Sequence, residues 1–253
     1  MSDQKIIGIL GGLGPAAGAD LFHKIIEETT ATCDQDHPAV ALLSYADRIP
    51  DRATYIRDSA KPNPVPPMWD VLMHLQRVGA SVASVPCITA HVSVIFGVLR
   101  DRLAQEGHAL RLLSMIEETV KFIQKQYPEI KKVGAISTWA TKRHRLFEQA
   151  LVGAGFEFVP PDDDIQDGVE AAIYDPQFGI KAISSPVHPQ ARENLVRSLR
   201  HLRQKGAEAV ILGCTELPIG IPESEIEGVI TIDPTRALAR ALIHAVAPDK
   251  LRK

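Results

Sequence analysis

The chain has little of what marks nucleic-acid-binding or membrane-spanning proteins. Aromatic residues make up 5% of its 253 residues, and 28 Lys and Arg against 31 Asp and Glu leave a formal net charge of −3. Stacking on bases needs aromatic side chains and a nucleic-acid footprint needs an excess of basic ones, so we expect no nucleic-acid partner. No apolar run approaches the ~18 residues of a membrane-spanning helix, so we also expect no membrane partner.

Cysteine is scarce, with three residues in the whole chain. The first apolar run, Ile6–Leu10, is shorter than the ~7–15 residues of a secretory signal core. We therefore expect a cytoplasmic protein whose cysteines are free thiols. Cys33 and His37 lie in one polar stretch, but their spacing matches no recognised metal site, so we expect no bound metal.

What the chain does contain is an internal repeat. Residues 79–87 and 206–214 both read Gly-Ala, six residues, Cys, at an offset of 206 − 79 = 127. Residues 5–10 and 131–136 also match, with their glycines at an offset of 134 − 8 = 126. Two pairs of segments at nearly one offset indicate a duplicated unit.

Short β-branched runs alternate with longer amphipathic segments, a pattern typical of a mostly parallel sheet covered by helices. The expected strands are Lys5–Leu10, Ala39–Tyr45, Ser81–Pro86, Ala109–Leu113, Lys132–Ser137, Phe156–Val159, Ala207–Leu212 and Val229–Ile232. The expected helices are Ala17–Thr30, Met68–Val78, Val92–Gln105, Met115–Lys125, Lys142–Val152, Pro189–Lys205 and Thr235–Ala245. Gly79, Gly107, Gly155 and Gly206 stand where helices are expected to end.

The repeat predicts an α/β protein of two pseudo-symmetric, doubly wound domains with the active-site cleft between them. We expect the N-terminal domain, which carries Cys87, to span residues 1–106 plus 217–253. The second domain, which carries Cys214, would span residues 107–216. Four prolines in residues 61–67 predict a surface loop. Residues 160–190 read as a short helix over 166–174 followed by a long loop that covers a site.

Cys87 and Cys214 each end an apolar run, where open α/β sheets place their active sites. One such cysteine more often packs as a small apolar side chain, but two at equivalent positions favour a pair of catalytic thiols. A neighbouring helix N-terminus would lower the pKa of each thiol. His91 and Glu216 lie four and two residues beyond the cysteines, either as helix caps or as groups that leave the thiols in different protonation states.

A glycine-rich turn follows the first strand and includes Gly12 and Gly14. It formally fits a dinucleotide-binding pattern, but a proline inside the turn and the lack of an acidic residue ending the second strand argue against that. Backbone amides that bind a carboxylate are the better interpretation. Thr138 lies in the repeat-equivalent turn, and Arg48 or Arg52 is either a carboxylate clamp or part of a loop salt bridge.

Together these motifs resemble the aspartate/glutamate racemase family over nearly the whole chain. The segments that carry the resemblance are the glycine turn 11–15, residues 36–38 and 49–52 of the substrate-carboxylate region, and the cysteine motifs 86–91 and 212–218. The second cysteine motif has Glu216 directly after Cys214-Thr215, and in this it resembles the aspartate racemase branch of the family. The resemblance implies racemisation of an amino acid, aspartate or glutamate, by Cys87 and Cys214 as two bases without a cofactor. It also implies a homodimer.

By the same resemblance Arg52 binds a substrate carboxylate, Lys181 meets the second carboxylate, and Thr89 and Thr215 line the pocket. The expected substrate-binding set is Gly12, Gly14, Arg52, Ile88, Thr89, Thr138, Lys181, Thr215 and Glu216. Ile88 departs from the family, which has Asn there, and this puts the identity of the substrate in question. Trp139 also differs from the family's small turn residue and would narrow the cleft.

Three other functions fit the same residues. A decarboxylase on this scaffold would need one cysteine, and a cis–trans isomerase would use one as a covalent nucleophile. A binding protein would keep the cleft while Ile88 blunted the chemistry. The intact pair of cysteines favours racemisation.

Overall fold

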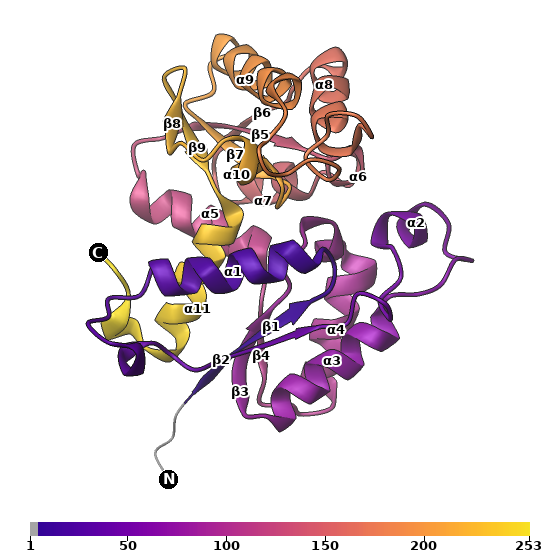
Figure 1. The fold of residues 1–253 in the computed structure, drawn as a ribbon, viewed down its shortest axis with the longest axis vertical. Helices are drawn as coiled ribbons and strands as arrows, with labels where there is room; N and C mark the ends of the chain where they lie inside the picture. Colours follow the sequence, from indigo (N-terminus) through magenta and orange to yellow (C-terminus); the bar gives the residue numbers. More distant parts are fainter. Residues whose placement is uncertain (1–4) are drawn as a thin grey trace. The chain divides into compact units, whose positions relative to one another are not determined.

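The computed structural model describes residues 5–253 and divides into two compact units, each with its own sheet (Figure 1). Unit 1 holds the described residues up to Glu118 together with Thr235–Lys253, and unit 2 holds Thr119–Pro234. The chain leaves unit 1 within helix α5 (Met115–Gln126) and returns at the start of α11 (Pro234–Val246). Both crossings lie further along the chain than the sequence-based boundaries after residues 106 and 216.

Unit 1 is built on a four-stranded parallel sheet in the order β2-β1-β3-β4. Its strands are β1 (Ile6–Gly11), β2 (Val40–Ser44), β3 (Ala80–Ser84) and β4 (Arg111–Leu113). Its helical segments are α1 (Pro15–Glu27), η1 (Asp34–Asp36), α2 (Arg52–Arg57), α3 (Val65–Arg77), η2 (Ile88–His91), the π-helix η3 (Ser93–Gly97), α4 (Val98–Gln105) and η4 (Pro248–Lys250). β1 reads as a continuous apolar run because it is a central strand, and Ile7, Ile9 and Leu10 are fully buried.

Unit 2 has a five-stranded sheet in the order β6-β5-β7-β9-β8, parallel except for the β8–β9 pair. Its strands are β5 (Lys132–Ser137), β6 (Glu157–Val159), β7 (Ala209–Gly213), β8 (Glu225–Ile226) and β9 (Val229–Ile232). Its remaining helices are α6 (Trp139–Arg143), α7 (Leu146–Gly153), α8 (Asp163–Tyr174), α9 (Pro189–Gln204) and α10 (Leu217–Gly220). Leu195, Leu199 and Leu202 of α9 share one helix face and are fully buried in this unit's core.

The two sheets repeat the same topology. The order β2-β1-β3-β4 in unit 1 corresponds to β6-β5-β7-β9 in unit 2, so β1 matches β5 and β3 matches β7. Cys87 lies just beyond β3 and Cys214 directly follows β7. The predicted α/β fold with two mostly parallel sheets is confirmed, and the repeat found in the sequence is a repeat of strand order.

The segment after Cys214 differs from its prediction. β9 pairs in parallel with β7, with Ile232 opposite Ile211, so residues 217–234 complete the sheet of unit 2. The expectation that the chain crosses back from residue 217 is therefore wrong, and α11 is the first element to return to unit 1. The physical reason is that β9 covers the edge of β7 that would otherwise present unpaired backbone groups.

Three further local predictions need correction. Residues 65–67 are not loop but the first turn of α3, where prolines are tolerated because the amides there have no intrahelical acceptor. The helix expected over 92–105 is a π-helix followed by α4. The helix expected over 142–152 is interrupted at Arg145, whose φ of 53° is left-handed.

The four glycines expected at helix ends are confirmed. Gly79, Gly107, Gly155 and Gly206 all have positive φ, between 69° and 95°, which other residues adopt only with strain. Within residues 5–253 no helix combines the length and the apolar character needed to cross a bilayer.

Candidate active site

Cys87 lies at the carboxyl edge of the unit 1 sheet, between β3 and η2. It is the N-cap of η2 in an extended conformation, and its side chain is largely buried. Its amide donates to Val85 O at 2.8 Å, and its carbonyl accepts from Ala90 N at 3.1 Å. The turn that carries the thiol is therefore fixed by backbone hydrogen bonds on both sides of the residue.

The two residues after Cys87 have different surroundings. Ile88 begins η2 and is 4% exposed, so it packs as an apolar side chain beside the thiol. Thr89 is half-buried, and its hydroxyl makes no hydrogen bond within residues 5–253. A free hydroxyl two residues from the thiol is available to a bound ligand.

His91 contacts the backbone of Cys87 rather than its thiol. The ring nitrogen Nδ1 lies 2.9 Å from Cys87 O, and Met115 N donates to Nε2 at 2.9 Å. Burial lowers the pKa of His91 to about 4, so the ring is neutral at physiological pH. Of the two sequence-based interpretations of His91, these contacts do not favour one in which it sets the protonation of Cys87, because the ring is uncharged and both of its nitrogens face backbone groups.

The glycine turn and Arg52 meet at the same edge of unit 1. Gly12 has a φ of 90°, and a Cβ there would lie 2.8 Å from the Tyr45 and Ala46 amides, so only glycine fits. Gly14, with a φ of 115°, is the N-cap of α1. Arg52 donates to Leu13 O at 2.9 Å, which ties its guanidinium to the turn.

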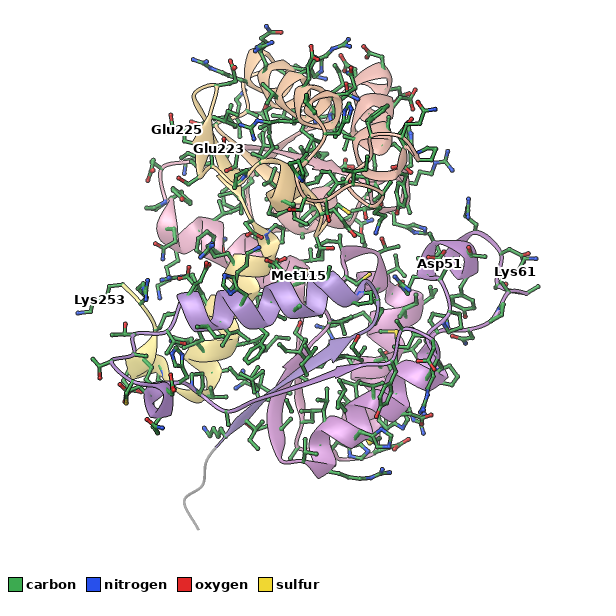
Figure 2. The ribbon with its side chains drawn as sticks, viewed as in Figure 1. Asp51, Lys61, Met115, Glu223, Glu225 and Lys253 are labelled. Atoms are coloured by element: carbon green, nitrogen blue, oxygen red, sulfur yellow. The ribbon has the colours of Figure 1, made fainter. Side chains whose placement is uncertain are left out.

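Arg52 begins α2, which is capped by Asp51 through a 2.7 Å bond from Thr54 N (Figure 2). Its second backbone partner is Pro50 O at 3.3 Å, and its Nε is buried without a partner. No carboxylate within residues 5–253 forms an ion pair with it. Because a half-buried guanidinium with only carbonyl partners keeps its full charge, it can take the carboxylate of a ligand.

Cys214 lies at the matching edge of the unit 2 sheet and contacts an acidic side chain. Its Sγ donates to Glu216 Oε2 at 2.9 Å, and Thr215 Oγ1 donates to the same oxygen at 3.1 Å. Lys181 Nζ donates to the other oxygen, Oε1, at 2.5 Å. Lys181 and Glu216 are 35 residues apart, so this cluster is a product of tertiary structure.

The charges of this cluster determine the protonation of Cys214. Burial, together with the negative charge of Glu216, raises the pKa of the Cys214 thiol well above its usual value. Burial alone would raise the pKa of Glu216, but Lys181 and the hydrogen bonds from Cys214, Lys181 and Thr215 lower it overall. Cys214 is therefore a thiol and Glu216 a carboxylate, and the sequence-based expectation of a lowered Cys214 pKa is wrong.

Thr138 follows β5 beside Cys214, because Ser137 and Gly213 are paired in the sheet. Its hydroxyl accepts from Thr141 N at 3.3 Å and thereby caps α6. It also donates to Thr141 Oγ1 at 3.2 Å. The hydroxyl is thus already bonded within the chain, and its role in substrate binding stays a prediction.

The turn after β5 is held by three side chains of α8 that the sequence did not single out. Gln166 donates to Ser137 O at 2.7 Å, and Glu170 accepts from Trp139 N at 2.9 Å. Asp167 accepts from the Trp139 indole at 3.0 Å. No spacing rule joins residues about thirty apart, so only the fold could reveal these contacts. The carboxylate of Glu170 thus accepts the hydrogen bond of the first amide of α6, which has no acceptor within the helix.

One segment of the resemblance lies away from these residues. His37 precedes β2, so it lies at the amino edge of the unit 1 sheet, whereas Cys87 follows the carboxyl end of β3. His37 instead lines a cavity of about 460 Å³ with the end of α1 and the C-terminal residues. Placing residues 36–38 in the substrate-carboxylate region is therefore wrong.

The polar stretch around Cys33 forms a local turn. Cys33 is exposed, and Asp36 accepts hydrogen bonds from Thr32 and the Cys33 amide. These bonds, chiefly those from Thr32, lower the pKa of Asp36 to about 2. Across residues 5–253, His, Cys, Asp and Glu side chains form no group of three or more suited to a metal ion.

Comparison with known proteins points to one family. Residues 10–242 match the family model described as Asp/Glu/Hydantoin racemase. The broad specificity amino-acid racemase RacX of Bacillus subtilis (strain 168) is 27% identical over 247 residues, covering 94% of this chain and 96% of the relative. The structure of an aspartate racemase from Picrophilus torridus is 26% identical with a TM-score of 0.75, covering 98% and 96% of the two chains. Glutamate racemase from Francisella tularensis has the same fold, with 17% identity, a TM-score of 0.64, and coverage of 99% and 84%.

Proposed function

We propose that this chain, which belongs to the Asp/Glu/hydantoin racemase family as its cysteine motifs predicted, interconverts the enantiomers of an amino acid. In this proposal Cys87 and Cys214 are the two bases and no cofactor takes part. The observation that carries the proposal is the equivalence of the two cysteines. Each follows the matching strand, β3 or β7, of two sheets with the same strand order. A reaction that treats two mirror-image substrates alike needs one proton-transfer group for each face of the α-carbon.

The resting protonation of Cys214 assigns the first half-reaction. Its sulfur donates to Glu216, which supports Cys214 as the acid, and we therefore propose Cys87 as the base of this half-reaction. The α-carbon–hydrogen bond breaks, its proton goes to the Cys87 sulfur, and the electron pair is delocalised into the α-carboxylate. The Cys214 sulfur–hydrogen bond then breaks and delivers a proton to the opposite face. The reverse reaction begins with the two thiols in exchanged states.

The substrate carboxylate needs cationic and amide partners to make the α-proton acidic. We assign these to Arg52 and to the glycine turn that it contacts through Leu13 O. The Thr89 hydroxyl, free within the described chain, would be a further donor, whereas the Thr215 hydroxyl already donates to Glu216 and its contact with substrate stays a proposal. These donors stabilise the negative charge that develops when the α-proton leaves.

Aspartate and glutamate are the substrates we propose to test first. A side-chain carboxylate of the substrate would have to displace Glu216 from Lys181, the cation that we propose for it, and a 26% identical relative carries the name aspartate racemase. Ile88 stands where the family has Asn, so the side-chain amide that would contact polar groups of the substrate is missing. The RacX relative is named for broad specificity. Neutral amino acids therefore belong in the same panel. We also propose a cytoplasmic homodimer, and light scattering of the purified chain would test whether it is a dimer.

The test is exchange of the α-proton, followed by NMR in D₂O, with both enantiomers of each amino acid. Two-base racemisation predicts loss of the α-proton signal, abolished in Cys87→Ala and in Cys214→Ala. Turnover of a substrate without α-proton exchange, if it survives in one of the two variants, would favour a decarboxylase or an isomerase with one essential cysteine. Saturable binding without exchange for any amino acid would mark a binding protein instead.

A further inference from the structure

His91 is the last residue of η2 and makes two buried hydrogen bonds to the backbone. Nδ1 lies 2.9 Å from Cys87 O, and Nε2 lies 2.9 Å from Met115 N. A carbonyl oxygen can only accept and an amide can only donate, so Nδ1 carries the proton and Nε2 carries none. These partners fix the tautomer and leave the ring no nitrogen for the thiol.

Met115 is the first residue of α5 (Figure 2). The first amides of a helix have no acceptor within the helix, and His91 Nε2 supplies one. α5 is also the helix in which the chain leaves unit 1, because the boundary lies between Glu118 and Thr119. The imidazole therefore connects the backbone of Cys87 to the start of the connecting helix.

A second set of contacts holds the same ring. His91 stacks on Phe96 of η3, with ring centroids 4.5 Å apart and an angle of 21° between the planes. The Arg100 guanidinium lies 5.7 Å from the Phe96 centroid, and Arg100 also pairs with Glu117 of α5 at 2.8 Å. Rotation of the His91 ring would break the stacking and both backbone hydrogen bonds, so its orientation is fixed.

We propose that His91 is a positioning residue for Cys87. The neutral imidazole of His91 holds the Cys87 carbonyl against the first residue of α5 and so sets the direction of the thiol. The inference rests on the proposed role of Cys87 in proton exchange. An acid–base role does not fit the geometry, because both nitrogens are bonded to backbone atoms. The charged groups that affect the ring are Glu117 and Arg100, and they act on its charge in opposite directions.

Two variants separate the role of the hydrogen bond from that of ring volume. His91→Asn keeps a donor near the position of Nδ1, whereas His91→Leu fills similar space and loses both bonds. His144→Asn, at an exposed histidine of unit 2, is the matched control. The first readout is the rate at which iodoacetamide alkylates Cys87, followed peptide by peptide, with Cys214 in the same samples as the internal reference.

We expect His91→Leu to change the Cys87 alkylation rate severalfold while the Cys214 rate stays constant. Misplacement of a reacting group by ~1 Å costs up to about 100-fold in rate, so kcat for α-proton exchange should fall by about 10- to 100-fold with little change in KM. His91→Asn should recover most of both losses. The pH profile of kcat should keep its shape in both variants.

Equal Cys87 alkylation in wild type and folded His91→Leu would overturn the proposal. So would the loss of a limb of the pH profile in His91→Asn, because that result would show that His91 exchanges protons. The alkylation readout does not need turnover. It therefore tests the positioning role even if wild type exchanges no α-proton, an outcome that would refute the proposed function alone.

Discussion

Replacing Glu216 by Gln should convert Cys214 from an unreactive thiol into a reactive one. The Glu216 carboxylate accepts a hydrogen bond from the Cys214 thiol, with sulfur and oxygen 2.9 Å apart, and a thiolate formed there would face a negative charge across that distance. Two unit charges about 4 Å apart interact by about 4 kcal/mol at an effective dielectric constant of about 20, and the repulsion across the shorter Cys214–Glu216 distance is at least that large. An amide of the same shape removes this repulsion and can donate a hydrogen bond to the thiolate.

An energy of about 4 kcal/mol corresponds to nearly a thousandfold change in the thiol–thiolate equilibrium. A more acidic thiol is a weaker nucleophile, which offsets part of the gain, so we expect alkylation at about pH 8 to accelerate at least tenfold. Lys181, which pairs with Glu216 in wild type, would remain and add to the effect.

The assay is iodoacetamide alkylation as a function of pH, with Cys214 and Cys87 peptides quantified by mass spectrometry. Cys87 lies in unit 1 and serves as the internal reference. Glu193→Gln, at an exposed residue of α9, is the control for the loss of one negative charge from unit 2. Superimposable Cys214 profiles for wild type and Glu216→Gln would show that the Glu216 carboxylate does not raise the pKa of the Cys214 thiol, which would refute this prediction.

Three other predictions rest on the Lys181 contact, on the burial of His91 and on the core of unit 2. Lys181→Met should slow Cys214 alkylation, the opposite of Glu216→Gln, because Lys181 lowers the pKa of both partners; the same alkylation assay checks it. Because the pKa of His91 is about 4 in the folded chain and about 6.5 in an unfolded one, its contribution to stability is complete above about pH 6.5. That contribution, of order 3 kcal/mol, should be lost as the pH falls toward about 4, and urea unfolding at several pH values, with His91→Asn for comparison, would show a flatter profile in the variant. Leu199→Ala, at a fully buried position of α9, should lower the free energy of unfolding by about 2–5 kcal/mol, whereas Val152→Ala at an exposed position should change it by less than about 0.5 kcal/mol; urea denaturation distinguishes them.

Some of the differences between prediction and structure have a local cause. The prolines of residues 65–67 read as loop because proline disrupts helix interiors, but the first turn of α3 lacks the hydrogen bonds that proline would remove. Arg145 splits an expected helix because its backbone is left-handed, and no residue type at that position announces this. β8 has two residues, too few for a periodic pattern.

The sequence by itself determined the class of fold and the positions of the two thiols. Alternating apolar periodicities specify strands and helices, helix-ending glycines set their limits, and the repeat offset makes two sheets with one strand order. Because parallel strands end at a common edge, the motifs after β1 and β3, and after β5 and β7, had to lie at the same edge of each sheet.

Only the tertiary structure decided what each side chain contacts. Glu216 is a carboxylate that accepts a hydrogen bond from Cys214 because Lys181, 35 residues earlier, pairs with it. His91 is neutral because the fold buries its ring, which accepts from Met115 N, 24 residues later. His37 lies at the far edge of the sheet from Cys87, although both motifs read alike as parts of one site. The physical reason is range: periodicity and backbone propensity act over a few residues, whereas burial and the distance between charges depend on how distant segments pack.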